Sequence, residues 1–248
     1  MNTTNKALAS SLLLLGLATS AMSSPLTIDD NGADFFIGEG TNASGVALGD
    51  TLGGPAYEVF GMSVSNDPFS LFVTVYTNFN ETTNSNYDYG DLFIDVDGWN
   101  PDGSAALNYS DDNDSNQSVW DYAVDVSSRS GGVADLVGLT GATLANSSDA
   151  FAGPLATREN QEVAYLSGGV VNAGAAGLTI DHGTSLTFQI ALSALGLNHL
   201  DRPEIGLRWT MTCANDITEG SYTVPEPGTL ALLGLGLLGL GLRKRVKS

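Results

Sequence analysis

The central part of the sequence has almost no positive charge. Residues 24–227 contain all 28 acidic residues of the chain and no lysine. Against these acids stand only the four arginines Arg129, Arg158, Arg202 and Arg208, which leaves a net charge of −24. Such a surface repels phosphate backbones and anionic lipid headgroups, so nucleic acid is excluded as a partner of the body.

Cysteine is nearly absent as well. The single Cys213 permits no intramolecular disulfide, so the fold must depend on its hydrophobic core or on bound metal. Cys213 ends an apolar alternation with Leu207, Trp209 and Met211, which predicts a buried side chain rather than a nucleophile.

The sequence also lacks the signatures of common enzymes. Its two histidines, His182 and His199, lie in turn-like contexts outside any HExxH pattern, and GxSxG, P-loop and Rossmann fingerprints are missing. We therefore expect a non-catalytic protein. A secreted glycoside hydrolase remains the alternative, because its paired carboxylates are recognised by their separation in space and acids are abundant here.

The first 23 residues have the layout of a secretory signal peptide. Lys6 precedes an apolar run at 7–18, and small residues follow it. We expect cleavage between Ala21 and Ser24, and export of the chain across the inner membrane.

The last part of the chain, residues 224–248, has three parts. Pro225, Glu226 and Pro227 come first, an apolar Gly/Leu-rich run follows at 228–242, and four bases close the chain. As a helix the apolar run reaches only about 22 Å, against about 30 Å for the hydrocarbon core of a bilayer, so it predicts a marginal transmembrane span. The bases should stay cytoplasmic, with the acidic body outside.

This three-part tail closely resembles the PEP-CTERM sorting signal of Gram-negative bacteria. The resemblance implies that an exosortase in the inner membrane cuts near Pro225-Glu226-Pro227 and passes the protein toward the cell surface or the extracellular matrix. Such proteins usually occur in species that make an extracellular polysaccharide.

Between the two ends, turn residues recur every eight to twelve positions and separate short apolar runs. This rhythm predicts an all-β, antiparallel, jelly-roll-like sandwich over residues 24–223. The run at 91–96 alternates as a half-buried strand does, and a helical turn is expected at 193–197. Strands are expected at 35–37, 57–64, 71–79, 91–96, 119–126, 163–166, 178–180, 186–192 and 205–213.

Three segments of the body carry a second resemblance. The run LTFQIALSALGL at 186–197, GDLFIDVDG at 90–98 and WDYAVDV at 120–126 are similar to segments of carbohydrate-binding family 9 and related DOMON-like sandwiches. The resemblance implies a jelly-roll-like body in which aromatic side chains can stack on sugar rings.

An acidic loop follows the strand at 91–96. Asp95, Asp97, Asn100 and Asp102 place oxygen ligands at near-alternate positions, which predicts a calcium loop. It is not an EF-hand, because Ala106 occupies the position of the bidentate glutamate. A solvated acidic turn is the alternative.

Trp99 lies within this loop and is our candidate sugar platform, with a packed cap over the sandwich end as the alternative. Trp120 and Tyr122 are expected in the core. Together these features predict an exported surface or matrix component that contacts extracellular polysaccharide, with calcium bridging the acidic body to an anionic glycan.

Processing provides the first test. A marginal span with the Pro-Glu-Pro motif on its outer side suits cleavage better than permanent anchoring, so the mature protein should lack the residues before about Ala21 and most of those after about Pro227. Intact-mass measurement on protein released from the native host checks this. Retention of the Gly/Leu-rich tail at the final location would contradict it.

Overall fold

The computed structural model describes residues 26–29, 51, 55–84, 86–98, 120–147, 161–167, 171–198 and 204–224. All of them belong to one compact unit, Met22–Pro227. The predicted signal peptide, the strand at 35–37, His199 and the residues after 224 lie outside this description. The described part of the chain contains no helix that is long and apolar enough to cross a membrane.

The described residues form strands joined by turns, and every pairing between strands is antiparallel. The predicted all-β antiparallel class is confirmed. The 3-10 turn η3 (Leu192–Leu195) confirms the helical turn expected near 193, and η1 (Pro55–Tyr57) is a second such turn. The strands are β1 (Leu26–Asp29), β2 (Val59–Asn66), β3 (Ser70–Thr77), β4 (Leu92–Asp95), β5 (Tyr122–Ser130), β6 (Val133–Gly138), β7 (Thr143–Asn146), β8 (Glu162–Ser167), β9 (Val171–Asp181), β10 (Ser185–Ala191), β11 (Glu204–Thr210) and β12 (Ile217–Thr223).

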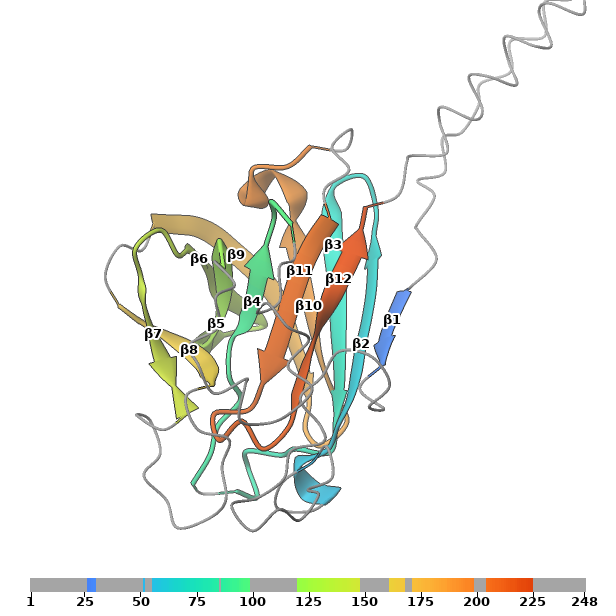
Figure 1. The fold of residues 1–248 in the computed structure, drawn as a ribbon, viewed down its shortest axis with the longest axis vertical. Helices are drawn as coiled ribbons and strands as arrows, with labels where there is room; N and C mark the ends of the chain where they lie inside the picture. The colour runs from blue at the N-terminus through green and yellow to red at the C-terminus, as the bar shows by residue number, and fades with distance from the viewer. Residues whose placement is uncertain are drawn as a thin grey trace, which may run out of the picture. The chain divides into compact units, whose positions relative to one another are not determined.

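Ten strands share one sheet, in the order β1-β2-β3-β10-β9-β6-β5-β4-β11-β12. The sheet folds over, so that β12 comes to lie beside β2 (Figure 1). Two hydrogen bonds join these ends: Tyr222 Oη donates to Asn66 Oδ1 at 2.6 Å, and Val59 N donates to Asp216 Oδ2 at 2.7 Å. The result is a sandwich in which β2, β3 and β10 face β4, β5 and β11.

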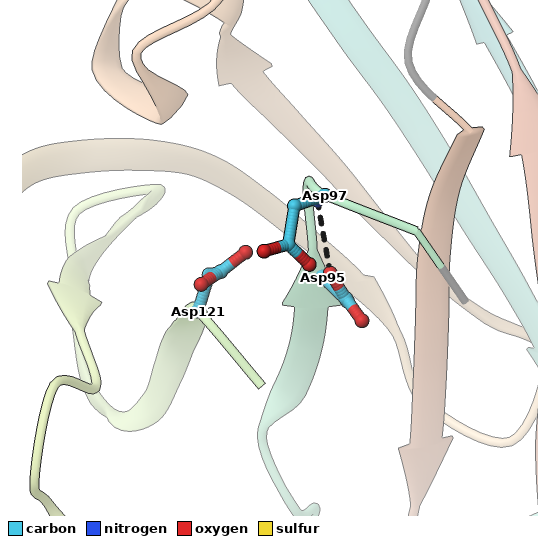
Figure 2. Close-up of side chains that lie close together, drawn as sticks. All are labelled: Asp95, Asp97 and Asp121. Atoms are coloured by element: carbon cyan, nitrogen blue, oxygen red, sulfur yellow. Dashed lines mark hydrogen bonds between the residues drawn. The ribbon is translucent and has the colours of Figure 1, made fainter. Parts of the chain in front are cut away.

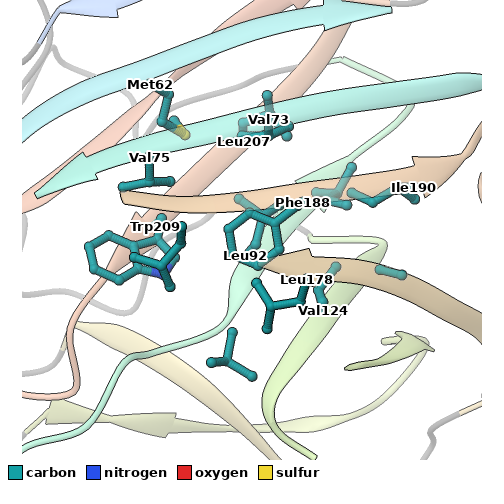
Figure 3. Packing of buried hydrophobic residues seen from close by; sticks show 14 of the residues in the cluster. Met62, Val73, Val75, Leu92, Val124, Leu178, Phe188, Ile190, Leu207 and Trp209 are labelled. Atoms are coloured by element: carbon teal, nitrogen blue, oxygen red, sulfur yellow. The ribbon is translucent and has the colours of Figure 1, made fainter. Parts of the chain in front are cut away.

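The main core fills the space between these layers. Met62, Val75 and Phe188 come from one layer and meet Leu207 and Trp209 from the other (Figure 3). Each of these strands alternates apolar and polar residues, and the apolar set points inward. Trp209 Nε1 donates to the carbonyl of Gly90 at 3.1 Å, which satisfies its one buried polar atom.

Cys213 and Trp120 lie where the sequence predicted them. Cys213 is fully buried in the main core, and burial raises the pKa of its thiol to about 12, so it is un-ionised at neutral pH. Trp120 is 4% exposed and packs with Phe93. Tyr122 is partly buried against the main core.

Strands β7 and β8 form a separate two-stranded sheet that covers the outer side of β4, β5 and β11. Beneath it Phe93 is fully buried and Asp95 is 3% exposed, so the prediction of a half-buried strand at 91–96 is wrong: β4 is covered on both faces. The close approach requires Gly90, because a Cβ there would lie 2.4 Å from the carbonyl oxygen of Thr210 and 2.5 Å from that of Val163.

Polar side chains between the sheet of β7 and β8 and the larger sheet have specific hydrogen-bond partners. Arg208 is fully buried; it donates to Glu219 at 2.7 Å and to Gln161 at 2.6 Å. Glu162 accepts a hydrogen bond from Trp120 Nε1 at 2.8 Å. Asp91 accepts from two backbone N–H groups, those of Val126 and Tyr165, each at 2.9 Å.

Burial raises the pKa of two of these carboxyls. The pKa of Asp91 rises to about 7, although its two N–H donors oppose the shift. The pKa of Glu162 also rises to about 7, although Arg208 and Trp120 oppose the shift. A carboxyl whose pKa is higher in the folded chain stabilises the fold below its unfolded pKa and loses that contribution as the pH rises.

The predicted strands that the structure describes all exist, with shifted ends. The largest change is at 178–180, which is the end of the much longer β9, Val171–Asp181. Among the described residues, four strands escaped prediction, namely β1, β6, β7 and β12. Of these, β12 reads ITEGSYT and β7 reads TLAN, so neither has the apolar alternation that marks a strand.

Glu162→Gln should stabilise the protein at alkaline pH. Glutamine keeps the acceptor for Trp120 Nε1 but carries no charge to bury, so the gain should be about 1–3 kcal/mol at pH 8 and should vanish near pH 4.5. Urea unfolding of the full-length chain in mild detergent measures it. Glu204→Gln, at an exposed position on β11, is the matched control. A loss of stability at pH 8 would mean that the ionised Glu162 is held favourably by Arg208.

Candidate metal centre

Strand β4 delivers the first carboxylate. Asp95 is its last residue, and its Oδ1 accepts a hydrogen bond from the backbone N–H of Asp97 at 3.0 Å. The chain bends at Val96 and Asp97 and reaches Gly98, whose φ of 131° is rarely adopted by residues with a side chain. This bend turns Asp97 back beside Asp95, while its side chain stays exposed to solvent (Figure 2).

The third carboxylate comes from the residue before β5. Asp121 N donates to the carbonyl of Ile94 at 3.0 Å, which extends the ladder between β4 and β5 by one bond. In return, Val96 N donates to Asp121 Oδ2 at 2.9 Å. The backbone N–H and the carboxylate of Asp121 are therefore both hydrogen-bonded to the end of β4 and the residue after it. Its carboxylate faces those of Asp95 and Asp97 (Figure 2).

We call Asp95, Asp97 and Asp121 the aspartate triad. One carboxylate oxygen from each lies within 4.8 Å of the other two. Two oxygens bound to one calcium ion at 2.3–2.6 Å can be at most about 5 Å apart, so the triad has the spacing of a shared ion. Calcium takes six to eight oxygens, so further ligands would have to come from other groups or from water.

The electrostatics of the triad favour a cation. Burial raises the pKa of Asp95 to about 6, and the charges of Asp121 and Asp97 act in the same direction. In the described part of the chain, the two arginine ion pairs are Arg129–Glu81 and Arg208–Glu219, and neither involves the triad. The repulsion among its carboxylates is therefore not offset by those arginines.

Part of the predicted site is assembled in the structure. Asp95 and Asp97 come together as a calcium loop requires, whereas Trp99, Asn100 and Asp102 lie outside the described residues. Asp121 was missed, although it lies in a predicted strand. The sequence places it 26 residues after Asp95, and only the pairing of β4 with β5 brings the two together.

Comparisons with known proteins bear on the tail of the chain. A family model described as the PEP-CTERM protein-sorting motif matches residues 223–245, which include Pro225, Glu226 and Pro227. No curated protein and no solved structure matches the chain.

The match confirms the predicted sorting tail. It makes the chain an exported protein that an exosortase sorts, with transient membrane anchoring before that step. The resemblance of the body to carbohydrate-binding family 9 and DOMON-like sandwiches gains no support from the comparisons and stays a prediction.

Proposed function

We propose that this chain is a non-catalytic component of the cell surface or extracellular matrix that binds calcium and contacts extracellular polysaccharide. The observation that carries the proposal is the aspartate triad, with three carboxylates within 4.8 Å in a body of net charge −24. The sorting motif at 223–245 supports a location where both calcium and polysaccharide are available.

Calcium has two roles in this proposal. It stabilises the fold, because the ion removes the repulsion among Asp95, Asp97 and Asp121, which are already held by backbone hydrogen bonds. It also lets so acidic a body approach an anionic glycan, since a divalent ion can bridge carboxylates on both partners. A neutral glycan needs no such bridge.

Trp99 remains our first candidate for a sugar contact, because it follows Asp97 by two residues in the sequence. An indole beside a calcium ion combines an apolar stacking surface with a Lewis acid for hydroxyls. Asn100 and Asp102 could add hydrogen bonds to the sugar and oxygen ligands to the ion.

The rival proposal, a glycoside hydrolase, finds less support. A general acid near neutral pH needs a raised pKa, which Asp91 and Glu162 have. Both side chains lie beneath the sheet of β7 and β8, however, and are only 3% and 6% exposed. Carboxyls so enclosed cannot reach a polysaccharide chain, which favours the binding role.

Calcium should raise the melting temperature of the full-length chain in mild detergent. A concentration of 100 times Kd would add about 2.7 kcal/mol of stability. Asp95→Ala with Asp97→Ala should abolish the rise while leaving the chain folded. The rise should also shrink between pH 8 and pH 5, because protons compete for Asp95, whose pKa is about 6.

The matched control is Asp135→Ala with Asp181→Ala, which removes the same charge from exposed positions on β6 and β9. An equal response of both double variants to calcium would mean general screening of the −24 charge rather than a bound ion.

Polysaccharide binding can be tested in native gels cast with the exopolysaccharide of the host. With calcium present, the full-length chain should be retarded, and Trp99→Ala should reduce the retardation. Measurement of reducing ends in the same mixture separates the two proposals, since a hydrolase releases them and a binding protein does not. If the host glycan causes no retardation, a structural coat protein without sugar affinity is the better interpretation.

A further inference from the structure

The outer face of the sheet formed by β2, β3, β10 and β9 carries a row of hydroxyl groups. Ser63 on β2 pairs with Thr74 on β3, Thr74 with Thr187 on β10, and Thr187 with Thr179 on β9. Thr74 Oγ1 lies 3.2 Å from Thr187 Oγ1, so these two central hydroxyls of the row hydrogen-bond to each other. With strands about 4.8 Å apart, the row spans roughly 14 Å.

These residues face outward because their neighbours along each strand fill the core. Val73 and Val75 on either side of Thr74 are fully buried, as are Leu186 and Phe188 on either side of Thr187. Thr179 is exposed, and the other three residues of the row are partly exposed. The layer of β7 and β8 covers the opposite half of the sandwich, so it leaves this face open.

Aromatic rings flank the hydroxyl row. A β-bulge between Val59 and Gly61 turns Phe60 outward next to the Gly61–Tyr76 pair. Phe60 is 49% exposed and Tyr76 is 42% exposed. Large rings exposed at neighbouring positions of two paired strands, on a body this acidic, indicate a contact area rather than a packing need. We call Phe60, Ser63, Thr74, Tyr76, Thr179 and Thr187 the hydroxyl–aromatic face.

The chemistry of this face selects its partner. None of its six residues is charged, although the body as a whole carries −24. Without a base it cannot hold an anionic group, and Asp181, which pairs with Ser185 next to Tyr76 in the sheet, repels one. Hydroxyls that both donate and accept, next to exposed rings, match a partner that combines hydroxyl groups with apolar C–H surfaces.

We infer that the hydroxyl–aromatic face binds a neutral polysaccharide chain, lying across β2, β3, β10 and β9. This inference rests on the proposed function for its partner class, but it places the contact on a face that neither Trp99 nor the aspartate triad belongs to. An open sheet face holds each sugar weakly, so binding depends on many copies displayed along one polymer. Calcium is not required.

Native affinity electrophoresis of the full-length chain in mild detergent tests the inference. Gels contain hydroxyethyl cellulose, dextran or galactomannan as neutral polymers, or alginate as an anionic one, each with EDTA or with calcium. At least one neutral polymer should retard the chain equally with and without calcium. Phe60→Ser with Tyr76→Ser should weaken the retardation about tenfold, because both stacking surfaces are lost.

A second variant keeps the aromatic rings. Thr74→Val with Thr187→Val preserves the β-branched shape and removes only the paired hydroxyls, so it should also weaken binding without unfolding the sheet. Leu166→Ser is the control, because it removes a 59% exposed apolar side chain from β8. It should leave the retardation unchanged.

The outcomes separate this inference from the proposed function. Retardation by alginate with calcium alone, or retardation that survives both double variants, overturns the inference and leaves the proposed function standing. Retardation by neither these polymers nor the host's own glycan overturns both. A dimer that Phe60→Ser with Tyr76→Ser dissociates, in the absence of glycan binding, would assign the face to a second copy of the chain and overturn the inference.

Discussion

The arrangement of this molecule depends on β4 being covered on both faces. On one face its residues join the main core with Trp209 and Leu207, and on the other Phe93 packs beneath β7 and β8. Gly90 makes the double covering possible, because carbonyl oxygens of β11 and β8 approach it where any larger residue would collide. A strand fixed this firmly gives a rigid starting point for the loop that follows it.

The covering of β4 on both faces disfavours the charge of Asp95 in the aspartate triad. Asp95 ends a strand enclosed on both sides, and the same covering that rigidifies β4 removes water from its carboxylate. A mobile loop could relieve the repulsion among three carboxylates by moving them apart, but hydrogen bonds from Val96 N and Asp97 N hold the carboxylates of Asp121 and Asp95 in place. The backbone therefore keeps mutually repelling carboxylates close together, which is the preorganisation expected of an ion site.

Sequence patterns predicted the strands of the core well, but they did not predict which strands pair with one another. The alternation through Leu207, Trp209 and Met211 identified a core strand, because these apolar side chains fill the main core while the polar Arg208 and Thr210 lie on the other face. Strands with little apolar content escaped: β12 is buried along most of its length although it reads ITEGSYT, and within it Glu219 pairs with Arg208 and the Tyr222 hydroxyl donates to Asn66. Local propensity cannot anticipate such burial.

Only part of the candidate site could be predicted, because sequence spacing does not show which strands pair. Asp95 and Asp97 are neighbours in the sequence, so spacing alone suggested them. Asp121 joins them through the register of β4 against β5, and the hydroxyl–aromatic face arises from the register of four strands. Register depends on which strands meet across the whole chain, and a single sequence records no such pairing.

The position of β12 also sets an order of events during export. It is the last strand that the structure describes, it closes the sandwich through the bond from Tyr222 to Asn66, and Val224 after it is 3% exposed within the main core. The matched sorting motif begins at residue 223, inside that strand. A chain that crosses a membrane from its N-terminus therefore cannot complete this sheet before the start of the sorting motif has also crossed, so the sheet closes no earlier than the arrival of the signal at the membrane.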